Sequence, residues 1–447
     1  SAAPVLADSF NTNLYTGNGA YKAVTGLGFG PSLTWIKIRS TTNSHSWTDY
    51  VRGNDLVIQS NETAAQTTGQ ITLDSDGFTI GNGNALRNSN GATYVAWNWK
   101  ANSIPTINTD GTIQSIVSAN QAAGFSIVKY TGIYPTVGTV GHGLSSTPEL
   151  IIIKNLPDTS DWEVYSETTG NTGNLIFNTS DAFATNSGFM NDTSPTASVF
   201  TVGNDGYVNG VGDDMIAYCF TSIAGFSKMS SYTGNSSTQA ITGLGFSPNW
   251  VLLKETDGVD SWEVYDTARG ATSVLYPNGN NAEGTNSGVT SFDADGFTLG
   301  SATSANESGK TYIYMAFKDN PTQYPIAAGE MGYLTVASGA NSGAGGGAGG
   351  LRTTYGTLSG GGASAETNLT LASGTYTITV GAGGADRGGG SSPPAYGGQG
   401  ISGSDSTITG TASVSTVGGG GGGSNSGSNA PPLSSAGVDG GSGGGQG

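Results

Sequence analysis

One phrase recurs along the chain and constrains its fold more than any other feature. "VTGLGFGPSLTWIKI" (Val24 to Ile38) returns as "ITGLGFSPNWVLLKE" (Ile241 to Glu255), and a weaker relative, "GHGLSSTPELIIIK", ends at residue 154. In each copy a lysine follows a proline by six residues, and these lysines are Lys37, Lys154 and Lys254. Their spacings of 117 and 100 residues indicate a repeated unit of roughly a hundred residues.

Each repeat has the pattern of a small β domain. "SWTDY" (Ser46 to Tyr50), "DWEVY" (Asp161 to Tyr165) and "SWEVY" (Ser261 to Tyr265) follow the lysines, and "TYVAWNW", "MIAYCF" and "TYIYMAF" close the copies. About six short strands separated by Gly, Asn, Asp and Ser turns predict an antiparallel sandwich or jelly roll. Since a unit of this size can bury a core alone, we expect three domains arranged as beads in a row.

The predicted organisation has five parts. Residues 1–100 form the first sandwich repeat, residues 101–222 an insert plus the second repeat, and residues 223–320 the third. A linker over 321–330 leads to a glycine-rich domain over 331–447. The opening "SAAPVLADSF" has the composition of a linker more than of a natural start, which is consistent with a cut before Ser1 or with a portion missing upstream.

The glycine-rich part is expected to be ordered. It holds 38 of the 75 glycines but lacks the strict Gly-x-y period of collagen. "NLTLASGTYTITVGAGG" alternates as strands do, and glycine lets extended segments pack without Cβ atoms between them. The fold class is therefore all-β: tandem sandwich or jelly-roll repeats followed by an extended, polyglycine-II-like or small β domain.

Composition excludes several classes of function. A net charge of −17 disfavours nucleic acid and anionic membrane surfaces as partners. Apolar runs are only strand-length, so no membrane insertion is expected. Cys219 is the single cysteine and lies in an apolar run, and His45 and His142 lie in polar turns. This set predicts no enzyme, no cofactor and no catalytic residues.

Candidate binding residues are few. "DSDGF" (Asp74, Asp76) and "DADGF" (Asp293, Asp295) resemble fragments of calcium loops and are weak calcium candidates. The twelve-residue ligand pattern is absent, and the pattern favours a turn whose side chains bond their own backbone. The Trp-x-x-Tyr sets recur in all three repeats, which favours packing; they are Trp47/Tyr50, Trp162/Tyr165 and Trp262/Tyr265. Three variable loops, "TTNSHSW", "NGNNAEGTN" and "GFMNDTSPT", are better candidates for recognition.

The repeated words resemble a known family. "FNTNLYTGNGAYKAVTGLGFGPSLTWIKIR", "TVGHGLSSTPELIIIKN" and "GFSKMSSYTGNSSTQAITGLGF" are similar to the repeated β domains of tail-fibre-like proteins from phages of marine and cyanobacterial hosts. "GTYTITVGAGGADRGGGSS" resembles the glycine-rich C-terminal domain of phage tail fibres and adhesins. The resemblance implies virion structure and host attachment, and it carries no catalytic residues.

These observations predict a tail fibre or receptor-binding protein on the surface of an extracellular phage particle. We expect a homo-oligomer, a trimer in most fibres, that contacts other tail proteins and a host surface glycan or outer-membrane protein. A capsid decoration or fibre protein and a secreted bacterial adhesin remain alternatives. A polysaccharide depolymerase would require two convergent carboxylates, to which no sequence feature points.

Overall fold

The structure is a computed structural model of the chain. It describes residues 9–101, 104–301 and 304–319, together with short strands and a few adjoining residues between positions 330 and 416. The chain divides into two compact units, residues 1–322 and 323–447. Among these described residues strands dominate and the three helices are single turns, which confirms the all-β prediction.

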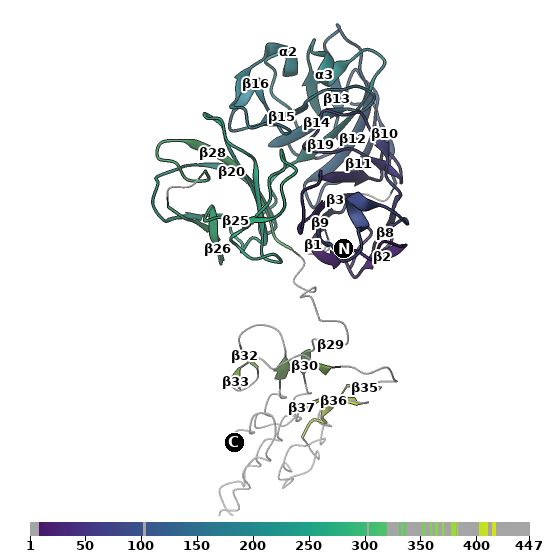
Figure 1. The fold of residues 1–447 in the computed structure, drawn as a ribbon, viewed down its shortest axis with the longest axis vertical. Helices are drawn as coiled ribbons and strands as arrows, with labels where there is room; N and C mark the ends of the chain where they lie inside the picture. Colours follow the sequence, from purple (N-terminus) through teal and green to yellow (C-terminus); the bar gives the residue numbers. More distant parts are fainter. Residues whose placement is uncertain are drawn as a thin grey trace, which may run out of the picture. The chain divides into compact units, whose positions relative to one another are not determined.

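In unit 1 the first repeat is a sandwich of two antiparallel sheets, drawn in purple and blue in Figure 1. A four-stranded sheet has the order β1-β9-β3-β4, and a three-stranded sheet has the order β2-β8-β7. The elements are β1 (Phe10–Thr16), β2 (Lys22–Thr25), β3 (Leu33–Ile38), β4 (Ser46–Asp49), β5 (Leu56–Val57), β6 (Thr67–Thr68), β7 (Ile71–Asp74), β8 (Gly77–Ile80), α1 (Ala85–Asn88) and β9 (Thr93–Trp99).

The third repeat has the same plan, with sheets β20-β28-β22-β23 and β21-β27-β26. Its strands are β20 (Ser227–Thr233), β21 (Gln239–Thr242), β22 (Trp250–Glu255), β23 (Glu263–Asp266), β24 (Ser273–Val274), β25 (Gly284–Thr285), β26 (Val289–Asp293), β27 (Gly296–Leu299) and β28 (Thr311–Phe317). In both repeats the last strand lies between the first and third, so a repeat is complete only when its whole length has folded.

The middle repeat enlarges this plan. Its sheet β12-β19-β14-β15 gains β11 and β10 from the predicted insert on one side, and β16 and β17 on the other. The elements are β10 (Thr106–Asn108), β11 (Ser115–Asn120), β12 (Phe125–Thr131), β13 (Gly138–Gly141), β14 (Leu150–Asn155), β15 (Trp162–Ser166), β16 (Gly170–Ile176), β17 (Ala184–Thr185), α2 (Ser187–Met190), β18 (Val199–Val202), α3 (Gly206–Asn209) and β19 (Asp214–Phe220).

The strand that begins two residues after the repeated proline is buried on both faces. All six residues of β3, β14 and β22 are buried. One face packs inside its own sandwich, as Ile36 and Ile38 do in the first repeat. The other face joins a core shared by all three repeats, as Leu33 and Trp35 do. Burial on two faces explains why these segments are near-continuous apolar runs rather than alternating ones.

The expectation of beads in a row is wrong. One hydrophobic cluster contains residues of every repeat, including all seven tryptophans of the chain, each at most 2% exposed. Trp35 of the first repeat packs edge-on against Phe177 of the second and Trp250 of the third, at centroid distances of 5.9 and 6.4 Å. The four-stranded sheets are too apolar on their inner faces to be left in water, so the repeats close around one another.

Unit 2 contains short antiparallel pairs among its described residues. These are β29 (Glu330–Met331) with β34 (Leu369–Thr370), β30 (Leu334–Val336) with β31 (Leu351–Thr353), β32 (Leu358–Ser359) with β33 (Ala363–Ser364), and β36 (Ser406–Thr409) between β35 (Thr377–Thr379) and β37 (Val414–Thr416). Strands therefore occur within "NLTLASGTYTITVGAGG", as predicted. The polyglycine-II-like packing predicted for this part lies outside the described residues.

Candidate functional site

The three repeated lysines lie where one repeat meets the next. Each is fully buried, and its ammonium group donates to a backbone carbonyl of a neighbouring repeat. The pairs are Lys37 Nζ to Asn280 O at 3.4 Å, Lys154 Nζ to Thr63 O at 3.2 Å and Lys254 Nζ to Ser180 O at 3.2 Å. Burial lowers the pKa of each lysine to about 8. The lysines whose spacing revealed the repeat therefore join neighbouring repeats, and each such contact region is called a joint below.

Eight residues after each lysine a ring nitrogen makes a second joint. Trp162 Nε1 donates to Gln59 O at 3.1 Å, and Trp262 Nε1 donates to Ile176 O at 2.9 Å. In the first repeat this position is His45, whose Nε2 lies 3.0 Å from Tyr276 O. The first repeat contacts the second, the second contacts the third and the third contacts the first. The interfaces are therefore head-to-tail, and the three repeats form a closed ring.

Strand pairing corrects the alignment of the Trp-x-x-Tyr sets. Asp49 lies opposite Leu33 and Asp266 lies opposite Trp250, the first residues of β3 and β22. Trp162 and Trp262 therefore correspond to His45, and Trp47 is displaced by two residues. Accordingly Tyr50 is 41% exposed, whereas Tyr165 and Tyr265 are buried. The predicted packing role holds for all three tryptophans.

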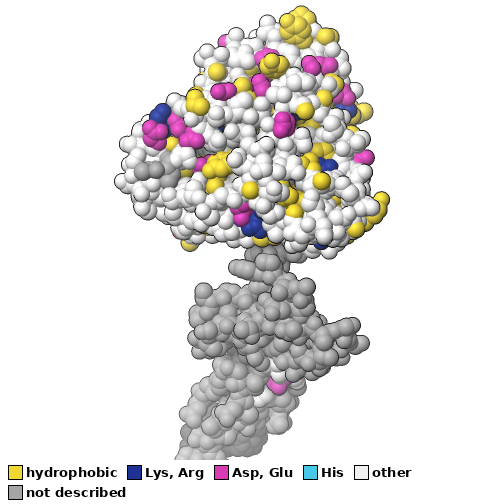
Figure 2. Space-filling model, viewed as in Figure 1, with side chains coloured by type: hydrophobic (Ala, Val, Ile, Leu, Met, Phe, Trp, Pro, Cys, Tyr) yellow, Lys and Arg dark blue, Asp and Glu magenta, His cyan; other side chains and the backbone are white. Residues whose placement is uncertain are grey.

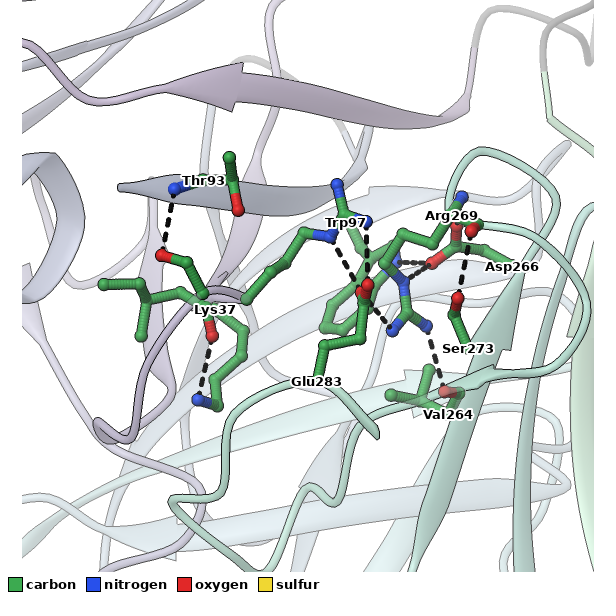
Figure 3. A network of polar contacts seen from close by, with 11 residues as sticks. Lys37, Thr93, Trp97, Val264, Asp266, Arg269, Ser273 and Glu283 are labelled. Atoms are coloured by element: carbon green, nitrogen blue, oxygen red, sulfur yellow. Dashed lines mark hydrogen bonds and ion pairs between the residues drawn. The ribbon is translucent and has the colours of Figure 1, made fainter. Parts of the chain in front are cut away.

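A buried ion pair reinforces the joint between the third and first repeats (Figure 3). Arg269 Nε lies 2.6 Å from Asp266 Oδ2, and both side chains are fully buried. Trp97 of the first repeat donates its indole N–H to the same carboxylate oxygen at 2.9 Å and lies beneath the guanidinium, 5.4 Å away. Glu283 accepts two 2.7 Å hydrogen bonds from Arg39 of the first repeat. Such hydrogen-bonded pairs offset the cost of burying the charges.

The other two joints show how this arrangement varies. Between the first and second repeats, Asp49 pairs with Arg52 and accepts a 2.7 Å hydrogen bond from Tyr218 Oη. At the joint between the second and third repeats, Ser166 occupies the position of the aspartate. Met315 occupies the position of the hydrogen-bond donor, which is Trp97 or Tyr218 at the other two joints. The acid and its donor are therefore lost together. The sequence signal for the pair is Asp-x-x-Arg-Gly, present in copies one and three.

The four calcium candidates have structural partners. Asp76 accepts the N–H groups of Gly26 at 3.1 Å and Gly28 at 2.7 Å. Asp295 does the same for Gly243 and Gly245, and these hydrogen bonds lower its pKa. The glycines have positive φ, which turns their N–H groups toward one carboxylate. This contact is what the repeated "TGLGF" phrase encodes.

The other two candidates, Asp74 and Asp293, each accept a 2.7 Å hydrogen bond from a threonine of the same hairpin. Within the described part of the chain, no group of three or more His, Cys, Asp or Glu side chains could hold a metal ion.

Both histidines and the cysteine are buried. The Trp35 indole N–H donates to His45 Nδ1 at 2.8 Å, so the proton of this ring is on Nε2. His142 Nδ1 accepts the N–H of Leu144, which places its proton on Nε2 facing Thr196 O. Desolvation lowers the pKa of both histidines and raises that of Cys219. All three are held in their neutral forms inside the fold.

Sequence reasoning missed two sets of buried polar residues. One set is Asn88, Asn209 and Asn306, which are fully buried. In each repeat Thr-Gly stands at the end of the first strand, and the backbone N–H of the next residue donates to the asparagine Oδ1 at 2.8 Å. A constant spacing of five residues from the asparagine to the first residue of the closing strand was the available signal. Glu163 and Glu263 are also buried, which raises the pKa of Glu163 to about 8 and that of Glu263 as well.

Two of the three predicted recognition loops are interface elements. In the loop 41–47, Asn43 donates its N–H to Asn280 O of the loop 278–286 at 2.8 Å. In the third loop, 188–196, residues 191–194 are exposed, whereas Phe189 and Met190 are buried. Elsewhere the surface that Figure 2 shows is mostly polar, with separated apolar groups and more acidic than basic side chains. Seven of the eleven exposed large apolar residues among the described ones lie in 104–211.

Two hollows open on this surface. One of about 680 Å³ lies beside the insert and is lined by Ala101, Thr106, Asn108, Asp110, Val117, Ala119, Asn120, Gln121, Gly143 and Leu144. Another, of about 450 Å³, lies on the first repeat and is lined by Tyr21, Asp55, Gln70, Ile71, Thr72, Thr79, Gly81 and Asn82. None of the helices described is long and apolar enough to cross a membrane.

Comparison with curated proteins gives no match, and neither does comparison with solved structures. One family model, described as Domain of unknown function (DUF7483), matches residues 6–321. The match spans all three repeats as one domain and ends where unit 1 ends. The chain therefore belongs to the DUF7483 family.

Proposed function

We propose that this chain is a virion attachment protein, a phage tail fibre or receptor-binding protein, in which unit 1 is a rigid head. The observation that carries the proposal is the closed ring of repeats. The seven tryptophans, the three repeated lysines and the ion pairs of Asp49 and Asp266 are buried and hold the ring together. The outer loops and the insert are thereby left free to vary without loss of the core, which is the arrangement that recognition requires.

Other features support the same proposal. The repeated words that resemble tail-fibre-like phage proteins lie in unit 1, and an acidic chain suits a particle outside the cell. Exposed apolar residues are concentrated in the middle repeat and its insert, and the insert strands β10 and β11 have no counterpart in the other two copies. Contacts with a host surface glycan or outer-membrane protein, and assembly of the chain as a trimer, are part of the proposal.

Immuno-electron microscopy tests it. An antibody raised against the purified chain should label the tails of phage particles that carry it, and the soluble chain should block their adsorption to host cells. Label on the capsid would favour a capsid fibre instead, and label on bacterial cells alone would favour an adhesin. Light scattering of the purified chain should give the mass of three copies.

A further inference from the structure

The hollow on the first repeat has a composition that suits a ligand. Tyr21 immediately precedes β2, and its ring is 76% exposed, the highest value among the described aromatic residues. In the described structure the Tyr21 hydroxyl and the side chains of Gln70, Thr72 and Asn82 have no hydrogen-bond partner within the protein. The hollow therefore combines an apolar platform with amide and hydroxyl groups that are free to bind.

Two residues of its lining have a backbone conformation that ordinary side chains avoid. Asp55 has φ of 71° and Gln70 has φ of 52°, and the Asp55 carboxylate accepts the N–H of Gln70. Only five non-glycine residues in the described part of the chain have positive φ. Strain of this kind is retained where it positions groups for function.

The third repeat shows that the fold does not need this strain. Hydrogen bonds from Gly69 to Asp55 O and from Asn286 to Thr272 O identify Thr272 as the counterpart of Asp55. In the same way, Ser287 is the counterpart of Gln70, because the backbone carbonyl of each accepts the N–H of the glycine that follows the neighbouring strand. Neither Thr272 nor Ser287 has positive φ. The same hairpin therefore closes without strain when the larger polar side chains are absent.

From these observations we propose that the Tyr21 hollow binds an uncharged saccharide. One face of a pyranose ring is lined with C–H groups and packs on an aromatic ring, while its hydroxyls alternate as donors and acceptors. Asp55 is the one charged residue of the lining, and the chain carries a net charge of −17, so anionic sugars are repelled. The volume of about 450 Å³ lies within the usual range of small-ligand sites.

The larger hollow beside the insert is less suited to this role. Asn108 uses its amide on Asp110, and Gln121 donates to Gly143 O at 3.0 Å. Among the residues that line it, none is aromatic. Its polar groups thus mainly hold the insert against the loop that His142 positions.

Isothermal titration calorimetry on the full chain tests the proposal. The probes are dextran, mannan and triacetylchitotriose, with dextran sulfate as the anionic counterpart of dextran. We expect saturable binding of at least one neutral probe and none of dextran sulfate. Tyr21→Ala should abolish binding. Gln70→Gly should weaken binding without lowering the melting temperature, because glycine adopts positive φ freely.

Matched controls separate the site from the fold. Tyr50→Ala removes another exposed tyrosine of the same repeat, and Asn191→Gly replaces another positive-φ residue, with φ of 50°. Both should bind as the parent chain does. Lack of binding to every neutral probe, or binding that survives Tyr21→Ala, would overturn the proposal. Loss of binding in Thr106→Trp but not in Tyr21→Ala would assign the saccharide to the larger hollow instead.

The biological role of the site depends on the proposed attachment function, and the two can fail separately. If virions are labelled and the soluble chain blocks adsorption, but the Tyr21→Ala chain blocks equally well, attachment stands and the saccharide site is wrong. If the chain binds a neutral saccharide through Tyr21 but is absent from virions, the site stands and the attachment function is wrong.

Discussion

The indole N–H of Trp97 donates to the carboxylate of Asp266 across 169 residues of sequence, at 2.9 Å, and so joins the first repeat to the last. Tyr218 makes the equivalent contact with Asp49 between the first two repeats. The third joint has Met315 facing the position of Ser166 and omits both charges. Unit 1 is therefore a ring of three head-to-tail interfaces within one chain, of which two contain a buried ion pair and the third does not.

The shared core predicts that unit 1 unfolds in one step. All seven tryptophans lie in it, so their fluorescence in the full chain reports on unit 1 alone. Leu253→Ala, in the core of the third sandwich, should lower the unfolding free energy by about 2–5 kcal/mol and shift the whole fluorescence transition in urea. A separate early transition of the third repeat, with the rest unchanged, would instead indicate independent domains.

The ion pair at the closing joint predicts a rescue by the residues of the third joint. Asp266→Ser leaves Arg269 buried beside Trp97 and should cost about 3 kcal/mol, as the loss of one partner of a buried pair does. Adding Arg269→Thr and Trp97→Met reproduces the joint made by Ser166, Thr169 and Met315, and should recover part of that loss. Urea denaturation of the single and triple variants measures both effects, and a triple variant less stable than the single would refute the equivalence of the joints.

The strands of the fold could be predicted from the sequence, whereas their partners could not. The apolar runs ending at Lys37, Lys154 and Lys254 are strands as expected. An apolar run buried on two faces, however, does not say which neighbour covers the second face, and the shared core was missed for that reason. The two-residue error at Trp47 arose because matching letters were aligned, whereas register is set by cross-strand pairing. Of the candidate site, the Asp76 and Asp295 turns could be located from the sequence, but their partners, the glycines of the "TGLGF" phrase, could not. The Tyr21 hollow depends on Asp55 and Gln70 meeting in space, which no local pattern indicates.

The buried lysines predict a rise in stability at alkaline pH. Their pKa is about 8 in the folded state and about 10.4 in unfolded chains. Between these values the unfolded state binds more protons, so the unfolding free energy increases with pH from 8 toward 10. Below pH 8 the lysines are charged in the folded state as well, so the full cost of burying their charge lowers the unfolding free energy. The Lys154→Met variant should show a smaller increase than the parent chain in urea denaturation across this range, and an identical slope would contradict the lowered pKa.

The pair Trp35 and His45 predicts a compensating exchange of volume. Cross-strand register makes Leu252 and Trp262 their counterparts in the third repeat, so the larger and the smaller side chain of the pair have changed places. His45→Trp alone would crowd Trp35, 5.6 Å away between ring centroids, and should lower the unfolding free energy by about 1–3 kcal/mol. The double variant Trp35→Leu, His45→Trp should regain most of this, because the new indole N–H can donate to Tyr276 O as Trp262 does to Ile176 O. A double-mutant cycle in urea measures the coupling, and additive losses would show that the two positions do not share one packing site.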